Sequence, residues 1–205
     1  MNTAASYFEE MYRRGPDPWG LGERWYEHRK YDLTLAALPR PRYRSAFEPG
    51  CSVGELTARL AVRCEAVLAC DRIPGPVATA AHRNAAHPHV SVRELVVPDQ
   101  WPDGSFDLIV LSELLYYFDE PHLHRLLERA LSALEPGGTL VTAHWNHSVA
   151  EHLRTGDEIA GTLAELPGLT LMTDLRDADF VLQIHGRQYG DGSSALSPAA
   201  AEGLV

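Results

Sequence analysis

Short apolar runs alternate with helix-like segments along most of this chain, and this alternation restricts its fold more than any other feature. The apolar runs are bounded by turn residues, as buried strands are, and lie at 66–70, 90–95, 106–112 and 138–145. Between them, 55–64 and 120–134 place apolar residues three and four positions apart, the spacing of helices that pack on a sheet. Repeated strand–helix–strand units predict a parallel sheet with helices on both faces.

The two ends of the chain follow other patterns. Near the C-terminus, strand-like runs at 169–173 and 180–187 are joined by a short polar stretch, which suits an antiparallel hairpin and not a crossover. Two helical stretches, 5–14 and 23–38, precede the first sheet strand. The last residues, 190–205, are rich in Gly, Ser and Ala, and we expect a flexible tail there.

Length and composition support one globular domain. With 205 residues, of which 45% are hydrophobic and 22% charged, the chain can bury one sizeable core. We predict a single domain over 1–189, in which an N-terminal helical cover (1–44) lies on a sheet core (45–189).

The net charge of −10 disfavours nucleic acid as a partner, because binding a phosphate backbone needs clustered Lys and Arg. The N-terminal stretch has no apolar core of the kind that signal peptides carry, and no run approaches the roughly 18 apolar residues that suggest a membrane span. We therefore expect a cytoplasmic protein with no membrane partner.

Cysteines and histidines offer little support for a metal site. Cys51, Cys64 and Cys70 form an odd set without a CxxC pair, which favours reduced thiols in a packed interior. Three histidines, 82, 87 and 89, lie in a loop-like stretch without the HExxH spacing of a helical zinc site. We predict that no metal is bound.

The stretch FEPGCSVGEL, residues 47–56, has the composition of a strand end, a glycine-rich turn and a helix start. Such a turn lets the backbone approach a ligand closely and presents free N–H groups at the helix N-terminus. Asp71 follows about 20 residues later, at the end of the next predicted strand, where a carboxylate can accept hydrogen bonds from both hydroxyls of a ribose. A tight turn without a ligand, and a helix-capping role for Asp71, are the alternatives.

The spacing of the turn separates two classes of cofactor. Dinucleotide-binding folds use GxGxxG, whereas here Gly50, Ser52 and Gly54 fall at every second position after Glu48. This motif resembles the first motif of class I S-adenosylmethionine-dependent methyltransferases, with Ser in place of the middle glycine. The resemblance continues in WPDGSFDLIVLSELLYYF and LEPGGTLVTAHW, which are similar to the fourth- and fifth-strand motifs of that superfamily.

A narrower resemblance is to the methyltransferases grouped with nodulation protein S, which N-methylate a deacetylated chitooligosaccharide. The stretches that carry it are DPWG, RWYEHRKYDLTLAAL, SELLYYF, TGDEIAGTL and DFVLQIHGR. The resemblance implies an α/β, Rossmann-like, doubly wound sheet of seven strands with an antiparallel last strand. It also implies S-adenosylmethionine as cofactor, S-adenosylhomocysteine as product and a small molecule as acceptor.

The same resemblance implies roles for residues of this sequence. Trp19 is expected to cover the sulfonium region, Leu95 to contact adenine, and Arg29, or its neighbour Lys30, to reach the cofactor carboxylate. The full set expected to bind the cofactor is Trp19, Arg29, Glu48, Gly50, Cys51, Ser52, Gly54, Asp71, Arg72, Leu95 and Ser112. Packing alone is the alternative for Trp19 and Leu95, and a charged helix face is the alternative for Arg29.

The acceptor is expected beyond the fourth and fifth strands. Glu113, Tyr116 and Tyr117 directly follow the fourth strand, and His144 ends the fifth. A carboxylate there can position an amine, take its proton and aim its lone pair at the methyl carbon. A buried structural hydrogen bond is the alternative for these residues. We predict methylation of an amine, for example of an amino sugar or a natural-product intermediate. Three competing hypotheses stay open: an O-methyltransferase, a cofactor-binding protein that has lost methyl transfer, and a nicotinamide oxidoreductase.

Overall fold

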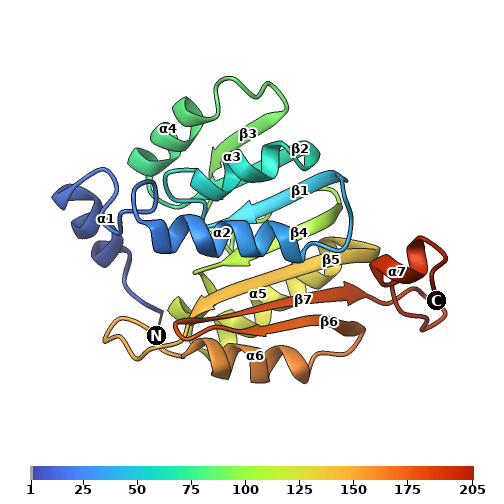
Figure 1. The fold of residues 1–205 in the computed structure, drawn as a ribbon. Coiled ribbons are helices and arrows are strands. Elements are labelled where there is room, and N and C mark those ends of the chain that lie inside the picture. The colour runs from blue at the N-terminus through green and yellow to red at the C-terminus, as the bar shows by residue number, and fades with distance from the viewer. Residues whose placement is uncertain (1) are drawn as a thin grey trace.

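The computed structural model describes residues 2–205, which form a seven-stranded sheet between helices (Figure 1). The strands run in the order β3-β2-β1-β4-β5-β7-β6, and all pairs are parallel except those of β7, which is antiparallel to β5 and β6. Their bounds are β1 Tyr43–Pro49, β2 Cys64–Asp71, β3 Val90–Glu94, β4 Phe106–Ser112, β5 Leu134–Trp145, β6 Leu169–Arg176 and β7 Phe180–Arg187. The predicted doubly wound α/β fold with an antiparallel last strand is confirmed.

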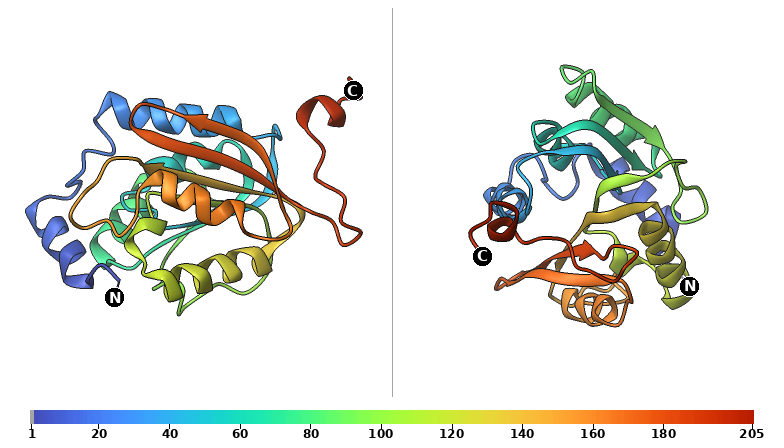
Figure 2. Two further views of the ribbon diagram at one scale, coloured as in Figure 1. Left: turned by 90° about the horizontal axis from the view of Figure 1, so that it is seen from below. Right: turned by 90° about the vertical axis from the view of Figure 1, so that its right-hand side faces the viewer.

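Helices cover both faces of this sheet, as Figure 2 shows. One face carries α2, α3 and α4, and the other carries α5 and α6. The helix bounds are α1 Ala5–Arg14, α2 Trp25–Ala37, α3 Glu55–Ala61, α4 Pro74–Arg83, the 3-10 turn η1 Leu115–Tyr117, α5 Glu120–Ala133, α6 Gly156–Ala164 and α7 Pro198–Ala201. Helix α1 lies beyond the carboxyl ends of β1, β4 and β5 (Figure 1).

Helices α4, α6 and α7 were not expected from the residue pattern. Helix α4 is rich in alanine and follows no apolar period, and it packs through Ala80 against Ala69 and Cys51. His82 lies in its last turn and not in a loop, so that part of the prediction was wrong. Within the tail, Ser197 accepts a hydrogen bond from the N–H of Ala200 and begins the short helix α7.

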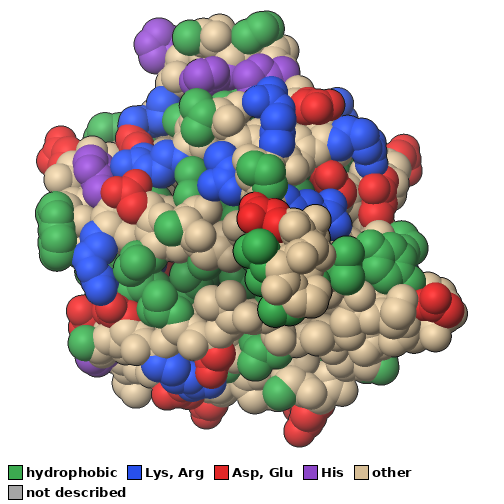
Figure 3. All heavy atoms as spheres, turned by 45° about the vertical axis from the view of Figure 1, so that its right-hand side comes forward, with side chains coloured by type: hydrophobic (Ala, Val, Ile, Leu, Met, Phe, Trp, Pro, Cys, Tyr) green, Lys and Arg blue, Asp and Glu red, His purple; other side chains and the backbone are tan. Residues whose placement is uncertain are grey.

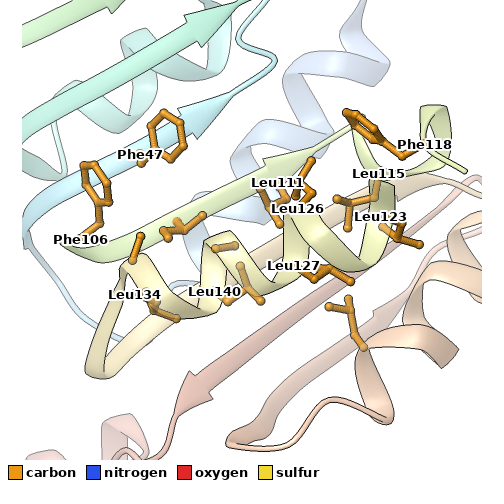
Figure 4. Packing of buried hydrophobic residues seen from close by; sticks show 14 of the residues in the cluster. Phe47, Phe106, Leu111, Leu115, Phe118, Leu123, Leu126, Leu127, Leu134 and Leu140 are labelled. Carbon is orange, nitrogen blue, oxygen red and sulfur yellow. The ribbon is translucent and has the colours of Figure 1, made fainter. Parts of the chain in front are cut away.

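The core between α5 and the sheet face of β1 and β4 is built from aromatic rings and leucines (Figure 4). Phe47 stacks on Phe106 with ring centroids 5.2 Å apart and meets the edge of Trp101 at 5.0 Å. Leu126 and Leu127 of α5 are fully buried in the same cluster. Dense packing of this kind resists deformation, so it gives the site above it a rigid floor.

The distribution of charged side chains on the surface and the state of the cysteines can be compared with what the sequence predicts. Histidine side chains gather at one end of the face drawn in Figure 3, and basic and acidic side chains are interleaved over it. Within residues 2–205, no group of three or more His, Cys, Asp or Glu side chains is arranged to hold a metal ion. All three cysteines are free and buried, as predicted. None of the helices in this part of the chain is long and apolar enough to cross a membrane.

Candidate active site

A cavity of about 540 Å³ opens at the carboxyl ends of the parallel strands. The strand order reverses there, between β1 and β4, and open α/β sheets bind their ligands at such switch points. Residues from the glycine turn line one end, and residues that follow β4 line the other. The predicted site residues on its wall are Trp19, Glu48, Gly50, Cys51, Ser52, Asp71, Arg72, Leu95, Ser112, Glu113, Tyr116 and Tyr117.

The glycine turn is held against β2 by its own backbone. The N–H groups of Gly50 and Cys51 both donate to the carbonyl of Cys70, at 2.7 and 2.9 Å. Gly50 has φ 80°, Ser52 φ 47° and Gly54 φ 77°, so the turn passes three times through the left-handed region that favours glycine. This conformation turns the loop toward the cavity at Gly50 and Ser52.

Gly54 serves a different purpose from the one expected. A Cβ at this position would lie 2.8 Å from Cβ of Ala80 and 2.9 Å from its Cα, so the residue allows α4 to pack closely on the turn. Gly54 is absent from the cavity wall. The close packing of α4 and the left-handed backbone at φ 77° together account for the glycine at this position.

Asp71 links the turn to the start of α4. Its Oδ2 accepts the N–H of Ser52 and its Oδ1 accepts the N–H of Ile73, both at 3.0 Å. Burial raises the pKa of this carboxyl, against the lowering effect of these N–H groups. The side chain thus organises the local backbone, and it still faces the cavity where a ribose is expected.

Glu48 is buried at the end of β1, and its Oε2 accepts a hydrogen bond of 2.6 Å from the hydroxyl of Thr57. Burial raises the pKa of Glu48 to about 8, and the nearby charge of Asp71 acts in the same direction. The carboxyl is consequently protonated at neutral pH, and it can donate as well as accept a hydrogen bond in the cavity wall.

This pKa predicts a pH dependence of stability. Between the ordinary value of 4.5 and the native value of about 8, the folded protein holds a proton on Glu48 that the unfolded chain has lost. The contribution of this proton to the free energy of unfolding is complete below the ordinary pKa of Glu48, and it is lost as the pH rises through the native pKa. We expect Glu48→Gln to flatten the fall of the free energy of unfolding over this range, measured by urea denaturation without ligand. Equal slopes for the variant and the wild type would contradict this, and the exposed Glu65→Gln is the control.

Helix α1 and the segment after it close the end of the cavity that the glycine turn lines. The hydroxyl of Tyr12 lies 2.5 Å from the hydroxyl of Ser52, and Tyr12 contacts Trp19 edge to face with centroids 5.3 Å apart. At the other end of α1, Phe8 packs on Tyr117 at 4.9 Å. The N-terminal segment therefore contacts both the glycine turn and the segment that follows β4.

The end of the cavity beyond β4 is organised around Glu113, which has φ 52°, a strained value for a residue other than glycine. Its Oε1 accepts a hydrogen bond of 2.6 Å from Nζ of Lys30. Its Oε2 accepts from the hydroxyl of Tyr116 and, at 3.2 Å, from the N–H of Trp145. Burial by itself would raise the pKa of Glu113, but Lys30, His144 and the hydrogen bonds outweigh it, and the pKa lies below its ordinary value.

Besides Gly54, two predicted site residues do not reach the cavity wall. His144 is buried, and its Nε2 accepts the N–H of Leu115 at 3.1 Å, so it positions η1 instead of facing an acceptor. Burial lowers its pKa to about 4. Arg29 points away and pairs with Asp177 at 2.6 Å. Neither position supports the direct role that we expected from the sequence.

His152 lies on the wall and was not expected there from the sequence; its ring stacks on Tyr116 at 3.7 Å. Tyr26 and Trp145 also line the wall and contact each other edge to face at 5.6 Å. Lys30, which was expected at the cofactor carboxylate, instead ion-pairs with Glu113. One sequence signal points to it, because it is the only lysine of the chain.

Comparison with known proteins places the chain in a family. The model of the family described as nodulation protein S (NodS) matches residues 9–164. Nodulation protein S of Rhizobium tropici is 31% identical over 127 residues, which are 61% of this chain and 53% of that protein. The protein of the same name from Bradyrhizobium diazoefficiens is 32% identical over 127 residues, 61% of each chain. The chain thus matches little more than half the length of these two relatives.

Solved structures agree with this placement. A candidate methyltransferase of Pseudomonas syringae is 45% identical with a TM-score of 0.72, covering 80% of this chain and 100% of that one. The N-methyltransferase NodS of Bradyrhizobium japonicum WM9, in complex with S-adenosylhomocysteine, is 24% identical with a TM-score of 0.78, over 92% of this chain and 100% of that one. The second likeness establishes the shared fold. With most of its length matched by the family model, this chain belongs to the nodulation protein S family.

Proposed function

We propose that the protein transfers the methyl group of S-adenosylmethionine to an amine of a small molecule and releases S-adenosylhomocysteine. The observation that carries this proposal is the single cavity wall that joins the glycine turn and Asp71 to Glu113 and Tyr116. One end suits a nucleoside with an amino-acid chain, and the other suits a polar acceptor.

The residues at the cofactor end fit such a ligand. Asp71 offers a carboxylate to the ribose hydroxyls, and the backbone of Gly50 gives the close approach that a methionyl chain needs. Trp19 presents an aromatic ring, which a sulfonium charge favours. Bound there, the cofactor supplies an electrophilic methyl carbon. Family membership supports S-adenosylmethionine as the cofactor, as does the S-adenosylhomocysteine bound to the NodS of B. japonicum.

An amine is a better acceptor for this site than a hydroxyl. A neutral amine attacks the methyl carbon without a base, and the new N–C bond forms while the C–S pair returns to sulfur. The positive charge passes to nitrogen, and a proton then leaves to water. A hydroxyl needs a base beforehand, yet Glu113 already accepts three hydrogen bonds and His144 accepts one. The finer proposals, an amino-sugar acceptor and a cytoplasmic location, rest on the family resemblance and on the sequence.

The test combines binding with turnover. Calorimetric titration with S-adenosylmethionine and S-adenosylhomocysteine should give micromolar binding, and NADH should give none. Release of S-adenosylhomocysteine is then measured with amino sugars, other primary amines and matched hydroxyl compounds. Turnover with amines supports the proposal. Turnover with hydroxyl compounds alone makes the protein an O-methyltransferase. Binding without turnover across the panel points to a protein that has lost methyl transfer, and binding of NADH alone overturns the proposal.

A further inference from the structure

Lys30 holds an unusual place among the charges of this protein. The 18 Lys and Arg residues include this one lysine, and all the others are arginine. Its side chain is 2% exposed, on the side of α2 that faces the cavity. Burying an ammonium is costly unless it is paired and hydrogen-bonded, so the contacts it makes there decide its role.

Those contacts are two carboxylates and an aromatic ring. Nζ of Lys30 lies 2.6 Å from Oε1 of Glu113 and 2.9 Å from Oε2 of Glu27. It also lies 5.0 Å from the centroid of the Tyr26 ring. All four residues line the cavity. Two carboxylates thus face one ammonium group, and the cluster carries one negative charge in excess.

Glu113 is held by donors from three elements. Lys30 belongs to α2, Tyr116 to η1, and the N–H of Trp145 to the end of β5. The left-handed backbone at Glu113 is strained, and such strain persists only where the surroundings impose it. The orientation of this carboxylate is therefore set by its partners and not by local backbone preference.

We propose that Lys30 is a positioning residue that keeps Glu113 ionised and fixed in orientation. The excess negative charge of the cluster then lies opposite the acceptor nitrogen and stabilises the positive charge that this nitrogen gains. This inference rests on the proposed function. It changes the role expected of Glu113, which stabilises charge on the acceptor and does not take its proton. The proton leaves to water after the methyl group has been transferred.

The charges around the pair agree with this role. Burial alone would lower the pKa of Lys30, but Glu113 and Glu27 together raise it, so the ammonium persists. Lys30 in turn is the largest influence that lowers the pKa of Glu113 against burial. The other titratable groups that interact with Lys30, Glu113 or Glu27 are Tyr26, Tyr31, Tyr116, Tyr117, His144 and His152.

The first test is the pH profile of kcat/KM for the best amine acceptor. In Lys30→Met the buried Glu113 loses its cation, and we expect its pKa to rise because burial is no longer opposed by the ammonium. The loss of kcat/KM should be about 100-fold at pH 7 and should narrow to within about tenfold at pH 9.5, where the carboxylate ionises again. Glu113→Gln should lose activity without that recovery. The double variant should resemble Glu113→Gln, because the lysine acts through the glutamate.

Two controls separate this role from a general effect on folding. Arg44→Met breaks an exposed ion pair with Glu135 at the opposite end of the sheet and should leave the profile unchanged. Lys30→Arg keeps the charge and should keep the wild-type shape of the profile, at reduced rate. A loss in Lys30→Met that is equal at every pH would overturn the proposal, because a merely structural residue behaves in that way.

A second measurement does not depend on turnover. Since the chain has one lysine, labelling with ¹⁵N-lysine gives a single side-chain ammonium signal. We expect this signal to be visible at pH 7 in the wild type because hydrogen exchange at a buried, paired ammonium is slow, and to shift in Glu113→Gln. The proposal would be overturned if the ammonium signal exchanged fast and its chemical shift were the same in Glu113→Gln as in the wild type. If no amine is methylated but the signal behaves as expected, the proposed function fails while the Lys30–Glu113 pairing stands.

Discussion

Replacing Asp71 with alanine should weaken binding of S-adenosylmethionine and S-adenosylhomocysteine at least about 100-fold, measured by calorimetric titration. A hydrogen bond to a charged group contributes about 1.5–3 kcal/mol, and we expect this carboxylate to make two with the ribose. The variant also leaves the N–H groups of Ser52 and Ile73 without their acceptor, which should lower the free energy of unfolding by about 1–3 kcal/mol.

The chain offers a matched control for the structural part of that effect. Asp107 also accepts two backbone N–H groups, those of Arg44 and Ser45, at 3.0 and 2.8 Å, but at the opposite end of the sheet. Asp107→Ala should cost a similar free energy of unfolding and leave cofactor affinity unchanged. If the two variants lowered affinity equally, Asp71 would be a structural residue, and the ribose contact would have to be assigned elsewhere.

Replacing Gly54 with alanine should have the largest effect on stability, a loss of about 3 kcal/mol in the free energy of unfolding. The left-handed backbone at φ 77° costs an alanine about 1 kcal/mol or more. The added Cβ would also lie 2.8 Å from Cβ and 2.9 Å from Cα of Ala80, and overpacking of this kind costs about 1–3 kcal/mol. Urea denaturation without ligand measures the loss.

Gly161→Ala is the matched control, and the sign of its effect should be opposite. This glycine lies inside α6, and no atom lies within 4 Å of the Cβ that alanine would add. Alanine should therefore stabilise the protein by up to about 1 kcal/mol, the difference in helix propensity. A Gly54→Ala protein with wild-type stability and weakened cofactor binding would show instead that the glycine is needed for the ligand.

Much of the fold was predictable because its signals are local. The strands Phe106–Ser112 and Phe180–Arg187 and the helix Ala5–Arg14 were predicted with the bounds that the structure has. Apolar period and turn residues encode such elements within a few positions. Helix α4 was missed because it packs through small residues such as Ala80, which leave no apolar stripe in the sequence.

The site divides in the same way. The sequence by itself determined the end of the cavity at the glycine turn and Asp71, since both belong to one strand–helix–strand unit whose geometry is set over about 20 residues. Only the tertiary structure decided the end around Glu113. There, Lys30 and Glu113 meet across 83 positions of sequence, His144 turns to the backbone of Leu115, and Arg29 points away to Asp177. The physical reason is that residue period sets which face of an element is buried, whereas the pairing of buried charges depends on how separate elements stack.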